Sequence, residues 1–389
     1  MIPLNIIIDG NYLFHRTLFI AMGFTNRNGI YLEKESEQNQ FIRKIATDFS
    51  YDVNLFKGCN KVIFTKDSRS WRKEYSAEYK SNRKYDKNIV NWNIFYQLMD
   101  EFIEIISKQG IITSSIEKAE GDDLIYLWSN YFLENKESSV IITADKDLTQ
   151  LVNYDDKNFI VVYSNKSKNK KIVTKTGFID WIKDKETKPI NIFNMEDAQI
   201  IADDANILLK KILNSDIEIE EIDPAGVLLE KIICGDKSDN VSSIWTWKNK
   251  NGNTNKATKT YFNKIYNTLI EKYYKIDIGE ITTNQALINR IKQIISSTSK
   301  QNISSKEFTE NLIRNWKLTC LNNETIPSEI QENFYSSLKS KNINTKCPSF
   351  NRIELLKGTK FEKKISVVSN IFDDEPVDDF QKILKKSKK

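Results

Sequence analysis

Glycine and histidine are scarce in this sequence, and their scarcity excludes several kinds of active site. Glycine makes up 12 of the 389 residues. Neither a GxGxxG nor a GxxxxGKS/T phosphate loop occurs. His15 is the single histidine, which excludes a HExxH zinc site and Cys2His2 fingers. Any catalysis must therefore use carboxylates, lysines, arginines or metal ions.

Paired cysteines and long apolar runs are also missing. The four cysteines are far apart and form no CxxC pair, which favours a reducing compartment over a disulfide framework. No apolar run approaches the ~18 residues that span a bilayer. The apolar stretch over residues 4–8 ends at Asp9, too early for a signal peptide. We therefore expect a monomer without membrane contact in the cytoplasm, or in the host cytoplasm if the protein is viral.

The first 165 residues have the pattern of an α/β fold. Three short runs rich in Ile and Val, at 4–8, 61–65 and 139–143, are each followed by an acidic residue. Such runs are typical of strands buried on both faces of a parallel sheet. Apolar residues at helical spacing predict helices over 93–109 and 121–134. Ligands of such sheets bind outside the carboxyl ends of the strands, where these acids are expected.

Nine acidic residues stand at strand ends or beside predicted helices. They are Asp9, Asp67, Glu120, Asp122, Asp123, Asp145, Asp147, Asp236 and Asp239. Brought to one rim, they would repel one another unless neutralised, and oxygen-ligated Mg²⁺ or Mn²⁺ is the natural counter-charge. The alternative for any single one is a turn or helix-capping residue.

Five motifs in chain order carry a family resemblance. They are Ile8-Asp9-Gly10-Asn11, Phe64-Thr65-Lys66-Asp67, Ala119-Glu120-Gly121-Asp122-Asp123, Thr143-Ala144-Asp145-Lys146-Asp147 and Gly235-Asp236-Lys237-Ser238-Asp239-Asn240-Val241. In this order the motifs resemble those of the 5′ nuclease (flap endonuclease) superfamily, most of all its phage RNase H branch, whose members remove primers during replication. The resemblance covers residues 1–245, and more loosely residues 246–325.

The resemblance implies a two-metal active site. Asp9, Asp67, Glu120 and Asp122 would hold one Mg²⁺, and Asp145, Asp147, Asp236 and Asp239 would surround the other, with Asp123 shared or in the outer shell. Mn²⁺ can replace Mg²⁺. In such sites one metal lowers the pKa of the attacking water and the other offsets charge on the leaving 3′ oxygen. We interpret His15 as a packing or capping residue.

The resemblance also implies a domain order and a fold. The expected fold is a mostly parallel central sheet flanked by helices (a PIN-like 5′ nuclease core), with a helical arch and a mainly helical C-terminal DNA-binding region. The predicted segments are the α/β core (1–165, with the arch at 68–92), an insertion (166–222), the helix of the last metal motif (223–245), the duplex-binding region (246–350) and a C-terminal segment with a flexible tail (351–389).

Residues 68–87 combine basic and aromatic side chains. Seven Lys and Arg residues stand against three Asp and Glu residues, interleaved with a Trp and three Tyr residues. This mixture suits a single-stranded nucleic acid, although a solvated amphipathic helix would look similar. Residues 79–83 are similar to the family's Tyr-Lys-x-Asn-Arg segment, so we assign Lys80 and Arg83 to the scissile phosphate, on one helical face. The predicted nucleic-acid contacts here are Arg69, Arg72, Lys73, Tyr79 and Lys84.

A second basic segment covers residues 246–275, where seven lysines face one glutamate. Relatives place a helix–turn–helix clamp on duplex phosphates at this point. The glycine-rich hairpin of cellular members is replaced here by residues 242–247, which disfavours a monovalent-ion site in this turn but leaves the question open. The predicted contacts are Lys248, Lys250, Lys256, Lys259 and Lys264. The alternative is a merely soluble surface.

The sequence therefore predicts a metal-dependent 5′→3′ nuclease that acts on branched, nicked or RNA-primed duplexes and removes primers in phage DNA replication. Alternatives are a flap endonuclease with little exonuclease activity, a PIN-type RNase, and a non-catalytic junction-binding scaffold. Residues 373–389 could form a helix with one apolar face. We predict that it binds a sliding clamp or single-strand-binding protein, the alternative being docking on its own core.

Overall fold

The structure is a computed structural model. It describes residues 4–23, 29–56, 59–83, 86–155, 158–166, 169–181, 217–248, 251–252, 254–260, 262–263, 266–267, 288–289, 291–293, 305–340 and 352–362.

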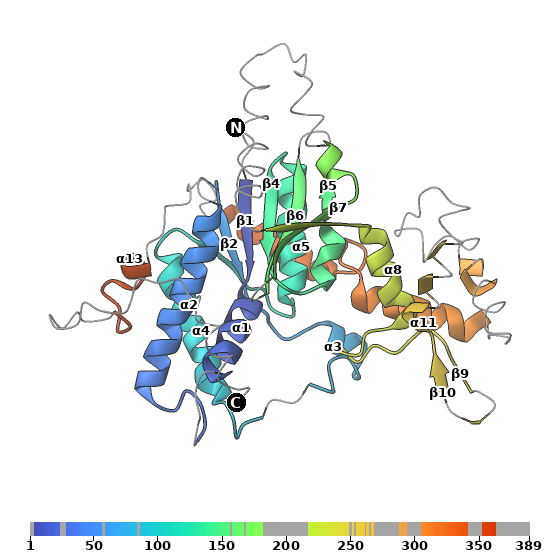
Figure 1. Cartoon of the computed structure of the whole chain (residues 1–389), viewed down its shortest axis with the longest axis horizontal. Helices are drawn as coiled ribbons and strands as arrows, with labels where there is room; N and C mark the ends of the chain where they lie inside the picture. The colour runs from blue at the N-terminus through green and yellow to red at the C-terminus, as the bar shows by residue number, and fades with distance from the viewer. Residues whose placement is uncertain are drawn as a thin grey trace, which may run out of the picture.

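An eight-stranded, mostly parallel sheet forms the centre of the molecule (Figure 1). Its order is β3 (Ile112–Ser114), β2 (Val62–Thr65), β1 (Leu4–Asp9), β4 (Ser138–Ile142), β6 (Phe159–Lys166), β7 (Asn169–Lys175) and β8 (Glu218–Ile222), and β5 (Asn153–Tyr154) pairs with β6. From β3 to β6 in this order, each strand runs parallel to the next, and β8 runs parallel to β7. Strands β5 and β7 run antiparallel to β6. The predicted fold class is confirmed, with strands at each of the three Ile/Val runs.

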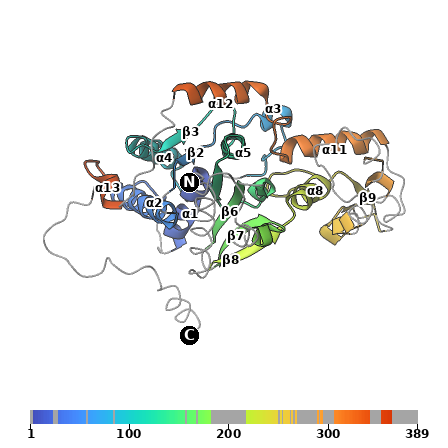
Figure 2. The ribbon, with the colours of Figure 1, turned by 90° about the horizontal axis from the view of Figure 1, so that it is seen from above.

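Helices cover both faces of the sheet because its central strands are apolar on both. Along β1, Ile6 and Ile8 pack into one core and Ile7 into the other. The first core joins α1 (Gly10–Gly23), α2 (Glu35–Leu55), α4 (Trp92–Ser107) and α13 (Arg352–Leu356). The second joins α5 (Gly121–Glu134) and α12 (Ser328–Ser340), which lie next to each other in Figure 2. Both helices predicted between the strands are therefore present, as α4 and α5.

A third cluster lies beyond the sheet, at the end of the molecule that holds the last acidic motif. It joins α8 (Pro224–Cys234) and α11 (Ser305–Thr319), next to the hairpin of β9 (Thr246–Lys248) and β10 (Thr254–Lys256) (Figure 1). Asp223 caps α8 by accepting from the backbone N–H of Ala225, and Pro224 is its first residue. Two further short helices, α3 (Arg72–Tyr75) and the 3-10 helix η1 (Asp147–Leu151), adjoin the site described below.

Several predicted segments have a different structure from the one expected. The supposed insertion over 166–222 contributes β7 and β8 to the central sheet, and residues 182–216 lie outside the described chain. The region at 246–350 begins with a β hairpin, and its α12 packs on α5 through Trp128 and Phe334. Within the C-terminal segment, Leu355, Leu356 and Phe361 belong to the first core, while residues 363–389 are not described. Among the described helices, none is long and apolar enough to cross a membrane.

A candidate active site of carboxylates and cations

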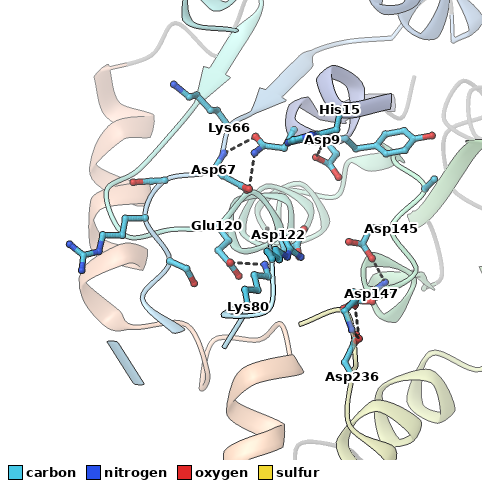
Figure 3. Close-up of a pocket in the computed structure, with 18 of the residues that line it drawn as sticks. Asp9, His15, Lys66, Asp67, Lys80, Glu120, Asp122, Asp145, Asp147 and Asp236 are labelled. Carbon is cyan, nitrogen blue, oxygen red and sulfur yellow. Dashed lines mark hydrogen bonds and ion pairs between the residues drawn. The ribbon is translucent and has the colours of Figure 1, made fainter. Parts of the chain in front are cut away.

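An acidic cavity of about 960 Å³ opens at the carboxyl ends of the parallel strands. Asp9 ends β1, Asp67 follows β2, and Asp145 follows β4, so the parallel order brings all three to one edge. The amino end of α5 adds Glu120 and Asp122. The cavity lining contains seven of the nine predicted acids, namely Asp9, Asp67, Glu120, Asp122, Asp145, Asp147 and Asp236 (Figure 3).

Hydrogen bonds fix the first carboxylates to the ends of the strands. Asn11 donates to Asp67 Oδ2 at 2.7 Å and accepts from the Asp67 backbone N–H at 3.0 Å. Gly121 donates its N–H to Asp67 Oδ1 at 2.5 Å, and a Cβ at this glycine would lie 2.8 Å from the same oxygen. Asp9 accepts from the backbone N–H of Tyr12 and from Thr143 Oγ1, both at 2.9 Å. The motif residues around the acids therefore orient them.

Several carboxylates at this edge have raised pKa values. Burial, with Asp67 and Asp145 nearby, raises the pKa of Asp9 to about 7. Burial and Glu120 raise the pKa of Asp67, and burial and Asp145 raise that of Asp122 well above its usual range. Among the described residues, no three acidic, thiol or imidazole groups are arranged so that they could bind one metal ion without moving. The donors are nonetheless all carboxylate oxygens, the set that divalent Mg²⁺ and Mn²⁺ prefer.

Glu120 differs from its neighbours because three donors hold its carboxylate. Lys80 Nζ lies 2.7 Å from Oε1, and Arg72 Nη1 and the Tyr79 hydroxyl donate to Oε2 at 3.0 and 3.1 Å. Although burial opposes ionisation, Lys80 and Arg72 lower the pKa of Glu120 to about 2. Glu120 is therefore a fixed carboxylate with a cation already in place beside it.

Lys231, on α8, joins the second group of acids and was missed from the sequence. Its Nζ forms ion pairs with Asp147 and, at 2.7 Å, with Asp236 Oδ2. Ser238 donates to Asp236 through both its N–H and its hydroxyl. Despite partial burial, these donors lower the pKa of Asp236 to about 2. The signal in the sequence was a lysine one helical turn before the Gly235-Asp236 motif.

Three predicted residues are buried where nucleic acid cannot reach them. Arg72 is 2% exposed and grips Asp123 with Nη1 at 3.0 Å and Nη2 at 2.8 Å. Tyr79 is 3% exposed and bonds to Glu120 and Asp239. The predicted DNA contacts of Arg72 and Tyr79 are therefore wrong in this structure, and Asp123 does not line the cavity. Asp239 is not in the lining either, and Arg83 binds it at 2.7 Å.

The segment that carries Lys80 and Arg83 is a turn and not the predicted helix. Within residues 68–83 the one described helix is α3, and Lys80 has a φ of +54°, in the left-handed region. The turn nevertheless directs both cations into the cavity, and Arg69 and Lys73 also line it. Lys84 lies outside the described chain.

Two of the predicted duplex contacts, Lys256 and Lys259, are described, and they do not line the cavity. Lys256 and Lys259 are exposed, and Lys259 lies 3.4 Å from Glu230. Lys248 is in β9 with its side chain not described, and Lys250 and Lys264 fall outside the described residues. These contacts stay predictions.

His15 forms part of the cavity wall by packing. Its ring lies 5.0 Å from that of Phe95 and 5.9 Å from that of Trp92. Burial, with Arg83 nearby, lowers its pKa to about 4, which keeps the imidazole neutral near pH 7.

Comparisons with known proteins find similarity to nucleases over part of this chain. Residues 5–182 match the 5′-3′ exonuclease, N-terminal resolvase-like domain. Over 166 residues the chain is 31% identical to a 5′-3′ exonuclease of Mycoplasmopsis pulmonis, with 42% of this chain and 49% of the relative covered. A 5′-3′ exonuclease of Buchnera aphidicola is 27% identical over 184 residues, 46% of this chain and 60% of the relative. The chain thus spans about half the length of the curated relatives it matches.

A solved structure of the bacteriophage T5 D15 flap endonuclease, in a complex with DNA and metal ions, is also similar. It is 14% identical, with a TM-score of 0.46, and the match covers 87% of this chain and 98% of that one.

Proposed function

We propose that this chain, whose residues 5–182 match a 5′-3′ exonuclease N-terminal domain, is a member of the 5′ nuclease superfamily and a metal-dependent 5′→3′ nuclease that hydrolyses phosphodiester bonds of DNA and RNA–DNA duplexes. The observation that carries the proposal is the cavity itself. Seven carboxylates line one cavity, and Lys80 and Arg83 line it with them. Carboxylates that bind metal, facing cations that bind phosphate, suit phosphodiester hydrolysis.

We propose that these carboxylates bind two divalent cations, Mg²⁺ with Mn²⁺ as a substitute, because carboxylate oxygens are the ligands that these ions prefer. Asp9, Asp67, Glu120 and Asp122 would hold one, and Asp145, Asp147 and Asp236 the other, while a role for Asp239 stays a prediction. When bound, such ions activate water and offset charge on the leaving oxygen. The raised pKa values of Asp9, Asp67 and Asp122 support this proposal, because burial and neighbouring carboxylates outweigh the effect of the nearby cations, and a bound metal ion would offset them.

The chain's own residues would orient the phosphate and stabilise its charge. Lys80 and Arg83 are positioned cations that face acids in a partly enclosed cavity, where electrostatic interactions are stronger than in water. Glu120 and Asp239 hold the two side chains at the cavity before substrate binds, and an arriving phosphate would compete with these carboxylates for the cations. Asn11, Gly121 and Thr143 keep the acids oriented.

The proposed substrates are 5′ ends on flaps, nicks and RNA primers, with primer removal in phage DNA replication as the biological role. Tyr75 supports contact with unpaired bases, because this residue is 44% exposed and lies on the segment that borders the cavity. Lys317 Nζ lies 5.2 Å from the centre of its ring. Lys256 and Lys259 would contact the duplex, and residues 373–389 a clamp or single-strand-binding protein. We propose that the protein acts as a monomer in the cytoplasm.

Cleavage assays can test this proposal directly. Flap, nicked and RNA-primed duplexes carrying a 5′ label are incubated with the protein and Mg²⁺. Short labelled products from the nick and the primer support exonuclease action, whereas release of whole flaps alone would make the protein a flap endonuclease. Binding without cleavage of any substrate would favour a junction-binding scaffold and overturn the proposal. Deleting residues 373–389 should leave cleavage of short substrates near normal and reduce stimulation by the partner protein.

A further inference from the structure

Two turns meet at the rim of the cavity and are joined by hydrogen bonds. We call residues 78–83 the basic turn and residues 236–241 the acidic turn. The backbone N–H of Lys80 donates to the Asp239 carbonyl at 2.8 Å, and Asn82 Nδ2 donates to the Lys237 carbonyl at 2.9 Å. In the other direction, Asn240 Nδ2 donates to the Glu78 carbonyl at 2.9 Å and to Ser81 Oγ at 3.0 Å. The basic turn is therefore held from a second, distant part of the chain.

Both turns contain a residue in an unfavourable backbone conformation. Lys80 has a φ of +54° and Asn240 a φ of +56°. The left-handed region is unfavourable for a lysine, and such a residue persists where its surroundings hold it. Asparagine tolerates this region better than most residues. The conformation of Lys80 thus depends on contacts outside its own turn.

The contacts of Asn240 differ in kind from the ion pairs of the cations. Lys80 pairs with Glu120, and Arg83 pairs with Asp239, so a phosphate entering the cavity competes for both cations. The amide of Asn240 is neutral, is exposed, and is not part of the cavity lining. Its two hydrogen bonds go to Glu78 and Ser81, which are not in the lining either. These bonds do not have to break when the ion pairs exchange.

We infer that Asn240 is a positioning residue that keeps Lys80 and Arg83 directed into the cavity through its hydrogen bonds to the basic turn. The inference rests on the proposed nuclease function for its effect on rate. Its structural part, the hold of the acidic turn on the basic turn, is independent of that function.

Two substitutions at this position separate the side-chain amide from the backbone. Asn240→Gly keeps the left-handed conformation available and removes the side chain. Asn240→Asp keeps the shape and removes the donor. Asn135→Gly is a matched control, since it removes an exposed asparagine that donates to the Tyr131 carbonyl at 2.7 Å. Asn135 follows the far end of α5, about 20 Å along the helix from Glu120 at 1.5 Å per residue.

Hydrogen exchange measures how firmly the basic turn is held, and it needs no substrate. In metal-free protein, amides of residues 76–83 should exchange faster in Asn240→Gly and Asn240→Asp, whereas those of α5 should not change. Asn135→Gly should leave residues 76–83 as in the parent protein. Unchanged exchange at residues 76–83 in both Asn240 variants would overturn the inference, even if the parent protein proves to be no nuclease.

Single-turnover cleavage measures the effect of Asn240 on the rate of hydrolysis. Loss of the amide should lower the rate about three- to tenfold, the value of one ordinary hydrogen bond, with the Kd for duplex changed less. In a background that carries both Lys80→Ala and Arg83→Ala, the same Asn240 substitutions should lower the rate by less than about twofold, because their effect passes through the two lost cations. An equal loss in both backgrounds would show that Asn240 acts by another route. A parent protein that cleaves nothing refutes the proposed function and leaves the exchange result to decide the positioning.

Discussion

Lys80 and Glu120, 40 residues apart in sequence, form an ion pair of 2.7 Å between Nζ and Oε1. The pair joins the basic turn to the amino end of α5, where the acidic cavity begins. A predicted phosphate-binding cation therefore lies against a predicted metal ligand. In the absence of substrate, each group balances the charge of the other.

The first prediction concerns the two cations of the basic turn. Lys80→Ala and Arg83→Ala should each lower kcat by about tenfold or more and change KM less, because contacts that strengthen in the transition state act on kcat. Lys360→Ala is the control, since Lys360 forms an exposed pair with Glu101. Steady-state kinetics on a flap substrate measures kcat and KM separately. Raised KM with unchanged kcat in both variants would mean that the two cations bind substrate uniformly.

The second prediction concerns the pH dependence of stability in EDTA. The pKa of Asp9 is about 7 in the folded protein against 3.8 in the unfolded chain, so its protonated form stabilises the fold. This contribution is complete below about pH 4 and is lost as the pH rises through about 7. The sign is opposite for Glu120 and Asp236, whose pKa values are lowered to about 2, and whose contribution is lost as the pH falls below about 4.

Asp9→Asn removes the first contribution without removing the polar group. The free energy of unfolding of the variant, relative to the parent protein, should increase by about 2 to 3 kcal/mol between pH 5 and pH 8. Urea denaturation in EDTA at a series of pH values measures this difference. Parallel profiles for the two proteins would show that Asp9 titrates normally in the fold.

The third prediction separates two neighbouring basic residues. Arg72→Met should destabilise the protein by about 3 to 5 kcal/mol, since it leaves the buried carboxylate of Asp123 without its partner. Lys73→Met, at an exposed position, should change stability by less than about 0.5 kcal/mol. Urea denaturation compares the two. If Arg72→Met were as stable as the parent and bound duplex more weakly, Arg72 would be a DNA contact after all.

The fourth prediction concerns the grip on duplex DNA. Changing Lys256, Lys259 and Lys264 together to Gln should weaken binding and reduce the slope of log K against log salt by about 0.9 for each lost phosphate contact. The triple change Lys108→Gln, Lys339→Gln and Lys360→Gln removes the same charge from other exposed positions. Binding measured at several salt concentrations gives both slopes. Equal slopes in the two triple variants would move the duplex site elsewhere.

The parts of the fold that could be predicted from the sequence depend on local patterns. Buried Ile and Val runs ending in Asp9, Asp67 and Asp145 predicted β1, β2 and β4, and parallel order then placed their acids together. Strand β8 was not predicted because glutamates interrupt its isoleucines and because its partner β7 lies more than 40 residues earlier. An edge strand with one polar face carries a weaker pattern than a central one.

The errors at the site arise from contacts between distant residues. Arg72 resembles its neighbours Arg69 and Lys73 in sequence, and its burial depends on Asp123, 51 residues away. The left-handed turn at Lys80 has no glycine to indicate it, since the acidic turn holds the residue from outside. Lys231 likewise acquires its role from Asp147, which another element supplies. Only the folded chain shows such pairings.

The central claim is that the carboxylates of the cavity hold divalent cations for hydrolysis. The most direct measurement is the single-turnover rate on a 5′-labelled RNA-primed duplex, for the parent protein and Asp122→Asn, across a Mg²⁺ titration that starts in EDTA. We expect no cleavage by the parent protein in EDTA and recovery with Mg²⁺. Asp122→Asn should be slower by about a hundredfold or more even in saturating Mg²⁺, yet bind the duplex at least as tightly because a negative charge near phosphate is gone. Cleavage by the parent protein in excess EDTA, or full activity of Asp122→Asn, would show that hydrolysis does not depend on metal ions held by these carboxylates.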